Sequence, residues 1–366
     1  MRFPGFEGEW EKKKLGEIGE VRMCRRIFND ETSLIDDVPF FKIGSFGKEA
    51  DAFISKELFL DYKKRFSFPR KGDILISAAG TIGRTVVYNG EDAYFQDSNI
   101  VWIDNDNTSI INDFLYYVLQ IVKYNTEGGT IQRLYNNTLR STEFNAPSIP
   151  EQRKIALALS HIYKRIQAQN KIIEELELLK NLLIKKSINR ELRFSEFTDD
   201  WNTMTLGEVC EKQASNISAN KIEVNFGDYA IYGASGELKK VDFYEVENDY
   251  IGIVKDGAGA GRLFYCEGRS SVLGTLDIIK PNKNVDTYFL YCLLSCIDFS
   301  KYSSGSTIPH IYFKDYANEK VKVPATGEQI KIANFLSTID QKIQTEKAIQ
   351  ERFETQKKVL LLQLLV

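Results

Sequence analysis

Apolar residues recur in alternating steps of four and three along two long stretches of the chain, residues 151–190 and 328–366. This is the spacing of a coiled-coil seam, and neither stretch contains a glycine or a proline. Pro147 and Pro150 end the segment before the first stretch, and Glu151 suits a first helical turn. We therefore predict two long helices that pair with each other. The alternative is an amphipathic helix packed only on its own domain.

The two predicted seams occupy matching places in the two helices. The first consists of Ile155, Leu159, Ile162, Ile166, Gln169, Ile173, Leu176, Lys180 and Leu183. The second consists of Ile332, Leu336, Ile339, Ile343, Glu346, Gln350, Phe353, Lys357 and Leu360. The four apolar residues that open each seam are expected to make the coiled-coil or partner contacts.

Outside these helices, short apolar runs separated by turns predict two globular units. In each unit a buried strand is expected to meet its neighbour across a glycine-rich loop, and a short helix follows. We predict an α+β fold for each unit, with a mostly antiparallel, barrel-like sheet. The expected strands are 72–77 and 85–88, then 249–254 and 263–266, and the expected helices are 112–123 and 287–298.

The chain is an internal repeat. Residues 2–6 return as residues 193–197, a shift of 191 positions. Residues 151–167 return as residues 328–344, a shift of 177, with ten identical positions of seventeen. The ends of each repeat are alike and the middles differ, as expected if one common framework carries two different recognition surfaces.

The repeat constrains the assembly. If the second unit has neighbouring ends, as compact domains usually do, the second long helix runs antiparallel to the first and the monomer approximates a two-fold axis. Roughly 37 helical residues make a rod of about 55 Å, with a globular unit at each end. The predicted domains are two globular units, 1–150 and 193–327, and two helical spacers, 151–192 and 328–366.

Length and composition agree with two domains. At 366 residues and 43% hydrophobic, the chain can bury two cores. Its five cysteines show no paired spacing and only two histidines accompany them, so we expect reduced thiols and no metal site. No signal peptide opens the chain, and no apolar run is long enough to span a bilayer. A soluble cytoplasmic protein without a membrane partner is expected.

Several motifs resemble the specificity subunits of type I restriction and modification enzymes. They are the paired layout, the Gly-Asp-Ile-Leu-Ile-Ser segment at 72–77, the Gly-Thr and Gly-Ser-Thr segments at 129 and 305, and the Pro-x3-Glu-Gln helix openings at 147–152 and 324–329. The resemblance covers essentially the whole chain. It implies two target recognition domains, each for half of a split double-stranded DNA site, and helices that act as a ruler.

The resemblance also implies partner proteins. The helices would bind two methyltransferase subunits and, through them, restriction subunits, while this chain would be noncatalytic. S-adenosylmethionine, ATP and Mg²⁺ would then be bound by the partners and no cofactor by this chain. Exposed apolar helix surfaces could also let the isolated chain dimerise.

The motifs that the chain lacks agree with a noncatalytic role. Its eight prolines never stand next to each other, whereas an adenine amino-methyltransferase needs Pro-Pro after Asp or Asn. The segment 257–262 lacks the lysine and hydroxyl of a nucleotide-binding loop, and no nuclease cluster is evident. Methylation or cleavage would therefore come from partner subunits.

Charge is the observation that argues against DNA binding. The chain has 48 Lys and Arg against 51 Asp and Glu, and its pI is about 5.8. Because neutralisation of phosphates supplies most nonspecific DNA affinity, we expect weak binding by the isolated subunit and tight binding only in the complex.

Candidate DNA-binding residues are polar or basic side chains near the glycine loops. Arginine suits guanine and glutamine suits adenine in the major groove. The glycines beside Arg84 and Arg262, which match at a shift of 178, could simply form tight hairpins, and His310 could be structural. The repeats differ in sequence at 130–133, so candidates are not transferred between them. The candidates are Arg70, Lys71, Arg84, Gln132 and Arg133, and then Lys255, Arg262, Ser306 and His310.

Two other classes of protein stay open at this point. A coiled-coil adaptor whose globular units bind proteins would have the same layout, and sequence-specific DNA dependence would separate it from a DNA-reading subunit. A self-contained enzyme is disfavoured by the missing motifs.

Overall fold

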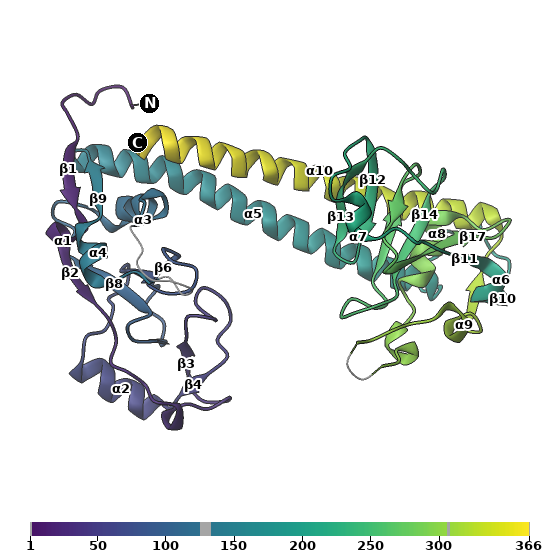
Figure 1. The fold of residues 1–366 in the computed structure, drawn as a ribbon, viewed down its shortest axis with the longest axis horizontal. Helices are drawn as coiled ribbons and strands as arrows, with labels where there is room; N and C mark the ends of the chain where they lie inside the picture. The colour runs from purple at the N-terminus through teal and green to yellow at the C-terminus, as the bar shows by residue number, and fades with distance from the viewer. Residues whose placement is uncertain (1, 125–132, 306–307, 366) are drawn as a thin grey trace. The chain divides into compact units, whose positions relative to one another are not determined.

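The computed structural model describes residues 2–124, 133–305 and 308–365 (Figure 1). It divides into two compact units. Unit 1 comprises residues 1–168 and 350–366, and unit 2 comprises residues 169–349. Each unit therefore contains a globular part and a section of both long helices. The predicted domain boundaries, which separate the helices from the globular parts, stay predictions.

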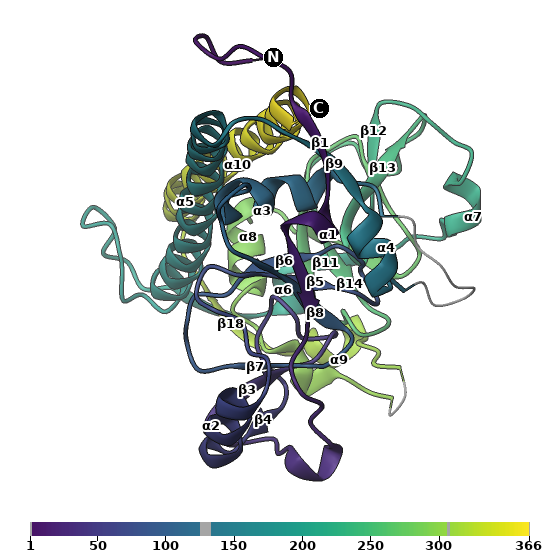
Figure 2. The same ribbon diagram turned by 90° about the vertical axis from the view of Figure 1, so that its left-hand side faces the viewer.

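Unit 1 is built on a four-stranded antiparallel sheet with the order β2-β8-β5-β6. The expected strands at 72–77 and 85–88 are β5 and β6 of this sheet. A three-stranded sheet, β4-β3-β7, and a two-stranded ribbon, β1-β9, complete the unit, and α2 lies at the three-stranded sheet (Figure 2). The strands are β1 (Glu11–Lys14), β2 (Gly19–Arg22), β3 (Val38–Phe41), β4 (Phe53–Ile54), β5 (Ile74–Ser77), β6 (Thr85–Val87), β7 (Tyr94–Phe95), β8 (Ile100–Asn105) and β9 (Glu143–Ala146). The shorter helices are α1 (Leu15–Ile18), α2 (Lys56–Arg65), α3 (Asn112–Ile121) and α4 (Asn136–Ser141).

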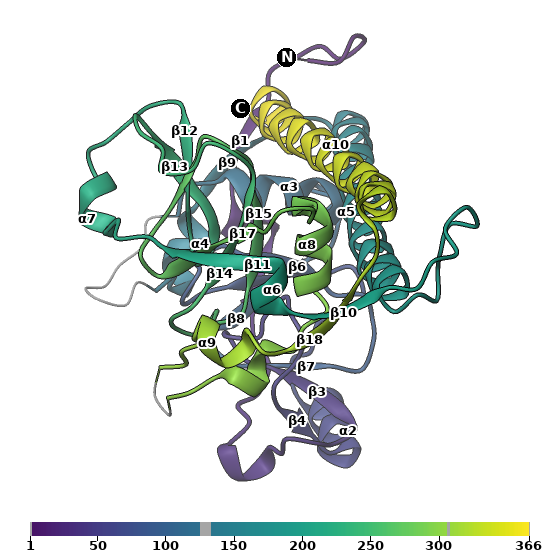
Figure 3. The ribbon, with the colours of Figure 1, turned by 90° about the vertical axis from the view of Figure 1, so that its right-hand side faces the viewer.

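Unit 2 repeats this topology strand for strand (Figure 3). Its sheets have the orders β11-β17-β14-β15 and β13-β12-β16, with the ribbon β10-β18. The strands are β10 (Asn202–Thr205), β11 (Cys210–Ala214), β12 (Tyr229–Gly233), β13 (Gly236–Val241), β14 (Tyr250–Val254), β15 (Leu263–Cys266), β16 (Ser271–Val272), β17 (Leu276–Pro281) and β18 (Lys320–Val323). The shorter helices are α6 (Leu206–Val209), α7 (Ala219–Ile222), α8 (Thr287–Leu294) and α9 (Phe313–Tyr316).

These pairings support the α+β class and the mostly antiparallel sheets. Among the described strands, the parallel pairs are β3 with β7 and β12 with β16. A barrel-like closure is not established by the pairings and stays a prediction.

Each four-stranded sheet is buried on both faces, which explains why its central strands are apolar throughout. In β5, Ile74 and Ile76 face the core that contains α3 and the long helices. Leu75 points the other way, into the core shared with the three-stranded sheet. In β14, Ile251 faces the core that contains α8 and the long helices, and Tyr250 faces the core on the other side of the sheet. Each unit is therefore a three-layer structure of helices, a four-stranded sheet and a smaller sheet.

The long helices are α5 (Ile149–Ile188) and α10 (Thr326–Leu365). In unit 1 the beginning of α5, at Ile155, shares a core with the end of α10, at Leu364. In unit 2 the end of α5, at Ile184, shares a core with the beginning of α10, at Ile332. The helices are thus antiparallel within each unit, and each also packs on a globular part. Coiled-coil geometry and the two-fold axis stay predictions.

Two shorter helices end earlier than the sequence predicted. The helix expected at 112–123 stops at Ile121. The helix expected at 287–298 stops at Leu294, where hydrogen bonds tighten into a turn. The Asp298 carboxylate then accepts a hydrogen bond from the Ser300 amide at 3.2 Å and caps a new 3₁₀ turn. Short polar side chains favour such caps over helix interiors.

The Glu-Gln pair that opens each long helix is structural. The Gln329 amide donates hydrogen bonds to the carbonyls of Asn284, at 3.1 Å, and Pro324, at 2.9 Å. Its oxygen accepts a hydrogen bond from the Asp286 amide at 2.9 Å. Gln152 makes the three corresponding bonds in unit 1. Each glutamine thus joins the helix start to the loop before α3 or α8.

The glutamate directly before each of these glutamines, Glu151 or Glu328, binds the opening segment of its repeat. Glu328 accepts hydrogen bonds from Arg193, at 2.7 and 2.9 Å, and from the Trp201 indole, at 3.1 Å. Glu151 accepts two from Arg2, both at 2.8 Å. Because both glutamates are buried, each needs its guanidinium partner. This explains why Arg-Phe openings and Glu-Gln helix starts recur together.

No helix in the described ranges combines the length and the hydropathy needed to cross a membrane.

Candidate nucleic-acid interface

In unit 2, a glycine loop at residues 256–261 joins β14 to β15. Gly257 and Gly261 have φ values of +92° and +89°, a region that glycine occupies without strain. A Cβ on Gly261 would lie 2.7 Å from the Cβ of Phe299. The Gly257 amide donates a hydrogen bond to the Pro309 carbonyl at 2.9 Å. The loop is therefore held against the segment that contains His310.

His310 lies at the centre of a polar and aromatic cluster in unit 2. Its Nδ1 is 2.7 Å from Oδ1 of Asp256. Its ring stacks on Tyr312, with centroids 6.5 Å apart and planes 16° apart. The Lys314 ammonium lies 5.6 Å from the Tyr312 centroid. The cluster offers an imidazole, an exposed ring and a cation within one short segment.

Arg262 and Arg84 play the same partly structural role in the two units. Arg262 donates a hydrogen bond to the Ala234 carbonyl at 2.9 Å, and Arg84 donates one to the Phe46 carbonyl at 2.9 Å. Each bond links the end of a glycine loop to the segment that follows a strand of the smaller sheet, β12 for Arg262 and β3 for Arg84. A guanidinium has five N–H donors, so this bond leaves capacity for a further ligand.

Lys255 is the third unit 2 candidate beside the loop. Its ammonium lies 3.1 Å from Asp277, and its side chain is 23% exposed. The structure thus brings Lys255, Arg262 and His310 together around one loop. The neighbouring carboxylates of Asp256 and Asp277 offset much of the positive charge of Lys255 and Arg262.

In unit 1 the candidates fall into two groups. Arg133 pairs with Ala79 in the glycine loop at 78–83, which Arg84 follows. Arg70 and Lys71 instead precede β5, at the other end of a strand that spans about 13 Å. Arg70 donates hydrogen bonds to Asp104, at 2.5 Å, and to a backbone carbonyl, whereas Lys71 is exposed. Arg84 and Arg133 therefore form the unit 1 counterpart of the His310 cluster. Gln132 and Ser306 lie outside the described residues.

Two exposed tyrosines were missed by sequence reasoning. Tyr135 and Tyr312 are each 50% exposed and directly precede α4 and α9. They are 177 positions apart, the shift that relates the long helices, and each follows a buried Leu or Ile. A buried apolar residue followed by tyrosine occurs in both repeats, and this recurrence is the sequence pattern that could have identified the two tyrosines. Asp256 was also missed, because its pairing with His310 joins segments 54 residues apart.

Comparison with known proteins gives a consistent result. The family model for the type I restriction modification DNA specificity domain matches residues 7–178 and again residues 198–355. A protein of Haemophilus influenzae, provisionally assigned as a type I restriction enzyme specificity subunit, is 56% identical over 147 residues, which are 40% of this chain and 38% of that protein. The MjaIX specificity subunit of Methanocaldococcus jannaschii is 24% identical over 92% of this chain and 88% of its own length.

Solved structures show the same fold. The S subunit of a type I restriction-modification system from M. genitalium aligns with a TM-score of 0.64 at 18% identity. The alignment covers 100% of this chain and 97% of that subunit. A chain from a study of assembly and conformational transition in the type I R-M system aligns with a TM-score of 0.53 at 15% identity, over 98% of both chains. With the DNA specificity domain present twice, this chain belongs to the type I restriction-modification specificity subunits.

Proposed function

We propose that each globular domain of this specificity subunit reads one half of a bipartite DNA target, and that the long helices set the distance between the halves. One observation carries the proposal. The two glycine loops have the same backbone attachments, but the side chains beside them differ, with Arg133 in unit 1 and His310 in unit 2. A shared framework with different exposed groups suits two different half-sites.

The chemistry of these groups suggests what each domain reads. Arg84 and Arg133 present donors that match guanine, each good bidentate pair being worth about 1 to 3 kcal/mol of discrimination. Asp256 beside Nδ1 of His310 favours the tautomer with the proton on that nitrogen, which makes Nε2 an acceptor. An acceptor suits the amino group of adenine or cytosine.

The helices supply surfaces for partner proteins. On α5, Leu178 is 70% exposed and Leu182 is 50% exposed, one helical turn apart. We propose that methyltransferase subunits cover such positions and that restriction subunits join through them. Those partners would bind S-adenosylmethionine, ATP and Mg²⁺ in the cytoplasm, and this chain would contribute no catalytic group. The alternative of a protein adaptor without DNA specificity is not favoured by the relatives.

The test is a genome-wide map of methylated bases after co-expression with the neighbouring methyltransferase subunit, compared with that subunit alone. A split motif around an unread gap, present only with this chain, is expected. Arg133→Ala should alter one half of the motif, and His310→Ala should alter the other. A stable complex that produces no new methylation would overturn the proposal.

A further inference from the structure

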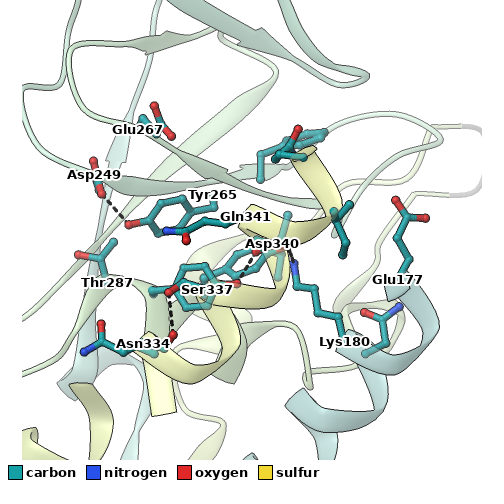
Figure 4. Close-up of a pocket in the computed structure, with 18 of the residues that line it drawn as sticks. Glu177, Lys180, Asp249, Tyr265, Glu267, Thr287, Asn334, Ser337, Asp340 and Gln341 are labelled. Carbon is teal, nitrogen blue, oxygen red and sulfur yellow. Dashed lines mark hydrogen bonds and ion pairs between the residues drawn. The ribbon is translucent and has the colours of Figure 1, made fainter. Parts of the chain in front are cut away.

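Unit 2 contains an open hollow of about 1210 Å³ between its globular part and its sections of the long helices (Figure 4). We call it the acidic hollow. Its walls come from α5, α8, α10 and the segment around β15. Among its lining residues are Lys180, Tyr265, Tyr288, Tyr291 and Asp340.

The lining is strongly negative. It contains six carboxylates and two ammonium groups, a formal difference of four charges. Both lysines are already paired, Lys180 with Asp340 at 2.6 Å and Lys347 with Glu177 at 2.7 Å. The four other carboxylates make no ion pair with any lysine or arginine of residues 2–124, 133–305 and 308–365. They are Glu237, Asp249, Glu267 and Asp286. Asp249 accepts hydrogen bonds from the Tyr265 hydroxyl, at 2.6 Å, and the Gly268 amide, at 2.8 Å. Asp286 caps α8 by accepting one from the Phe289 amide at 2.8 Å.

A cluster of tyrosine rings forms the floor between these charges. The centroids of Tyr265 and Tyr288 are 5.2 Å apart, and Tyr291 lies 5.9 and 5.7 Å from them. Lys180 shows that the cluster accepts a cation, because its ammonium lies 5.2 Å from the Tyr291 centroid. Burial lowers the pKa of this lysine, but Tyr291 and Asp340 outweigh that effect, so the pKa is raised and the lysine stays charged. Aromatic faces with nearby carboxylates favour cationic ligands.

The acidic rim distinguishes unit 2 from unit 1. In unit 1 a lysine again approaches the tyrosines, since the ammonium of Lys357 lies 5.1 Å from the Tyr163 centroid. At the shift of 177 that relates β5 to β14, however, Gly72 stands where unit 2 has Asp249. At the shift of 178 that applies after the glycine loop, Asn89 stands where unit 2 has Glu267. The tyrosine and lysine contact belongs to the shared framework, whereas the carboxylates of Asp249 and Glu267 are particular to unit 2.

The charge excludes nucleic acid as the occupant, because a phosphate backbone would be repelled. We propose that the acidic hollow docks a basic segment of a protein partner, whose arginine or lysine side chains pair with the carboxylates of Glu237 and Glu267 and lie against the tyrosine rings. This surface is separate from the glycine loops, and it does not depend on the proposed reading of half-sites.

The test uses the full chain and a tetra-arginine peptide with blocked ends as the probe, with binding followed by calorimetry. The variant E237Q/E267Q removes two exposed rim charges that make no ion pair. Asp228→Asn with Glu245→Gln changes the same charge at exposed positions of unit 2 outside the hollow. The rim variant should weaken binding about five-fold while the control stays near wild type, because the variant loses two exposed ion pairs with the peptide.

Two results would overturn the proposal. They are no binding by the wild-type chain and equal weakening in both variants. Circular dichroism of each variant checks that the fold is kept. The methylation map of E237Q/E267Q with its methyltransferase separates the two proposals. An unchanged split motif would support the reading of DNA half-sites, independent of whether this variant binds the peptide.

Discussion

Replacing Gln329 with glutamate tests the role assigned to the helix openings. The two side chains have nearly the same shape, so packing is kept. Only the hydrogen-bonding pattern changes: the nitrogen that donates to Asn284 and Pro324 becomes an oxygen that faces two carbonyls about 3 Å away. Gln329 is 2% exposed, so water cannot compensate. The least costly folded state is then one in which the carboxyl group is protonated.

The magnitude follows from that protonation. A glutamate has a pKa of about 4.3 in the unfolded chain, so holding it neutral at pH 7.5 costs about 4 kcal/mol at about 1.4 kcal/mol per pH unit. One donated hydrogen bond is also lost, worth about 1 kcal/mol. Gln329→Glu should therefore lower the free energy of unfolding by about 5 kcal/mol at pH 7.5. The pKa of the introduced carboxyl group is higher in the folded state than in the unfolded state. The loss of unfolding free energy relative to wild type therefore grows as the pH rises from the unfolded-state pKa to the folded-state pKa.

Urea unfolding at pH 6.5 and 7.5 measures both effects. Trp201 is the tryptophan of unit 2 and its indole contacts Glu328, so its fluorescence reports on this region. The deficit relative to wild type should be about 1.4 kcal/mol smaller at pH 6.5. Gln344→Glu, at an exposed position of α10, should change stability by less than about 0.5 kcal/mol. A loss below about 1 kcal/mol for Gln329→Glu, or a deficit independent of pH, would refute the reasoning.

Three further predictions address DNA reading, spacing and thiol chemistry. Tyr312→Ala should weaken binding of the complex to its target about ten-fold in a filter-binding assay, as truncation of an aromatic contact costs more than about 1 kcal/mol; unchanged affinity would remove this ring from the interface. Inserting four residues near Gln169 together with four near Glu346 should lengthen the unread spacer in the methylation map without altering either half-site, and an unchanged spacer would end the ruler hypothesis. Burial raises the pKa of Cys24 to about 12, so mass spectrometry should find this thiol unmodified by iodoacetamide at pH 8 until urea is added; rapid native labelling would contradict its burial.

The sequence predicted the repeated framework because that framework depends on local patterns. The seam spacing located both long helices, and apolar runs beside glycine loops located β5, β6, β14 and β15. A strand buried on both faces needs apolar residues throughout, which is visible without knowing its neighbours. The short β3, β4 and β7 were missed, since two to four residues carry too little periodicity to identify a strand.

The candidate site could be predicted only in part, because side-chain pairing joins distant segments. Arg70 and Arg84 are both basic and near the same strand, yet Arg70 bonds to Asp104 at one end and Arg84 to Phe46 at the other. Composition gives no sign of that division. The pairing of His310 with Asp256 likewise depends on how the glycine loop meets a later segment.

The division between framework and loop residues has a consequence for how specificity could change. The residues that hold each unit to its helix, such as Gln152 and Gln329, have the same bonds in both repeats and are buried. Beside the glycine loops, Arg133 in unit 1 and His310 in unit 2 occupy matching positions and differ between the repeats. Substitutions at the exposed Arg133 should therefore alter DNA reading while costing little stability, since surface changes away from caps and buried networks are usually within about 0.5 kcal/mol. Such a chain can acquire a new target through its loops while its helices and partner surfaces stay unchanged.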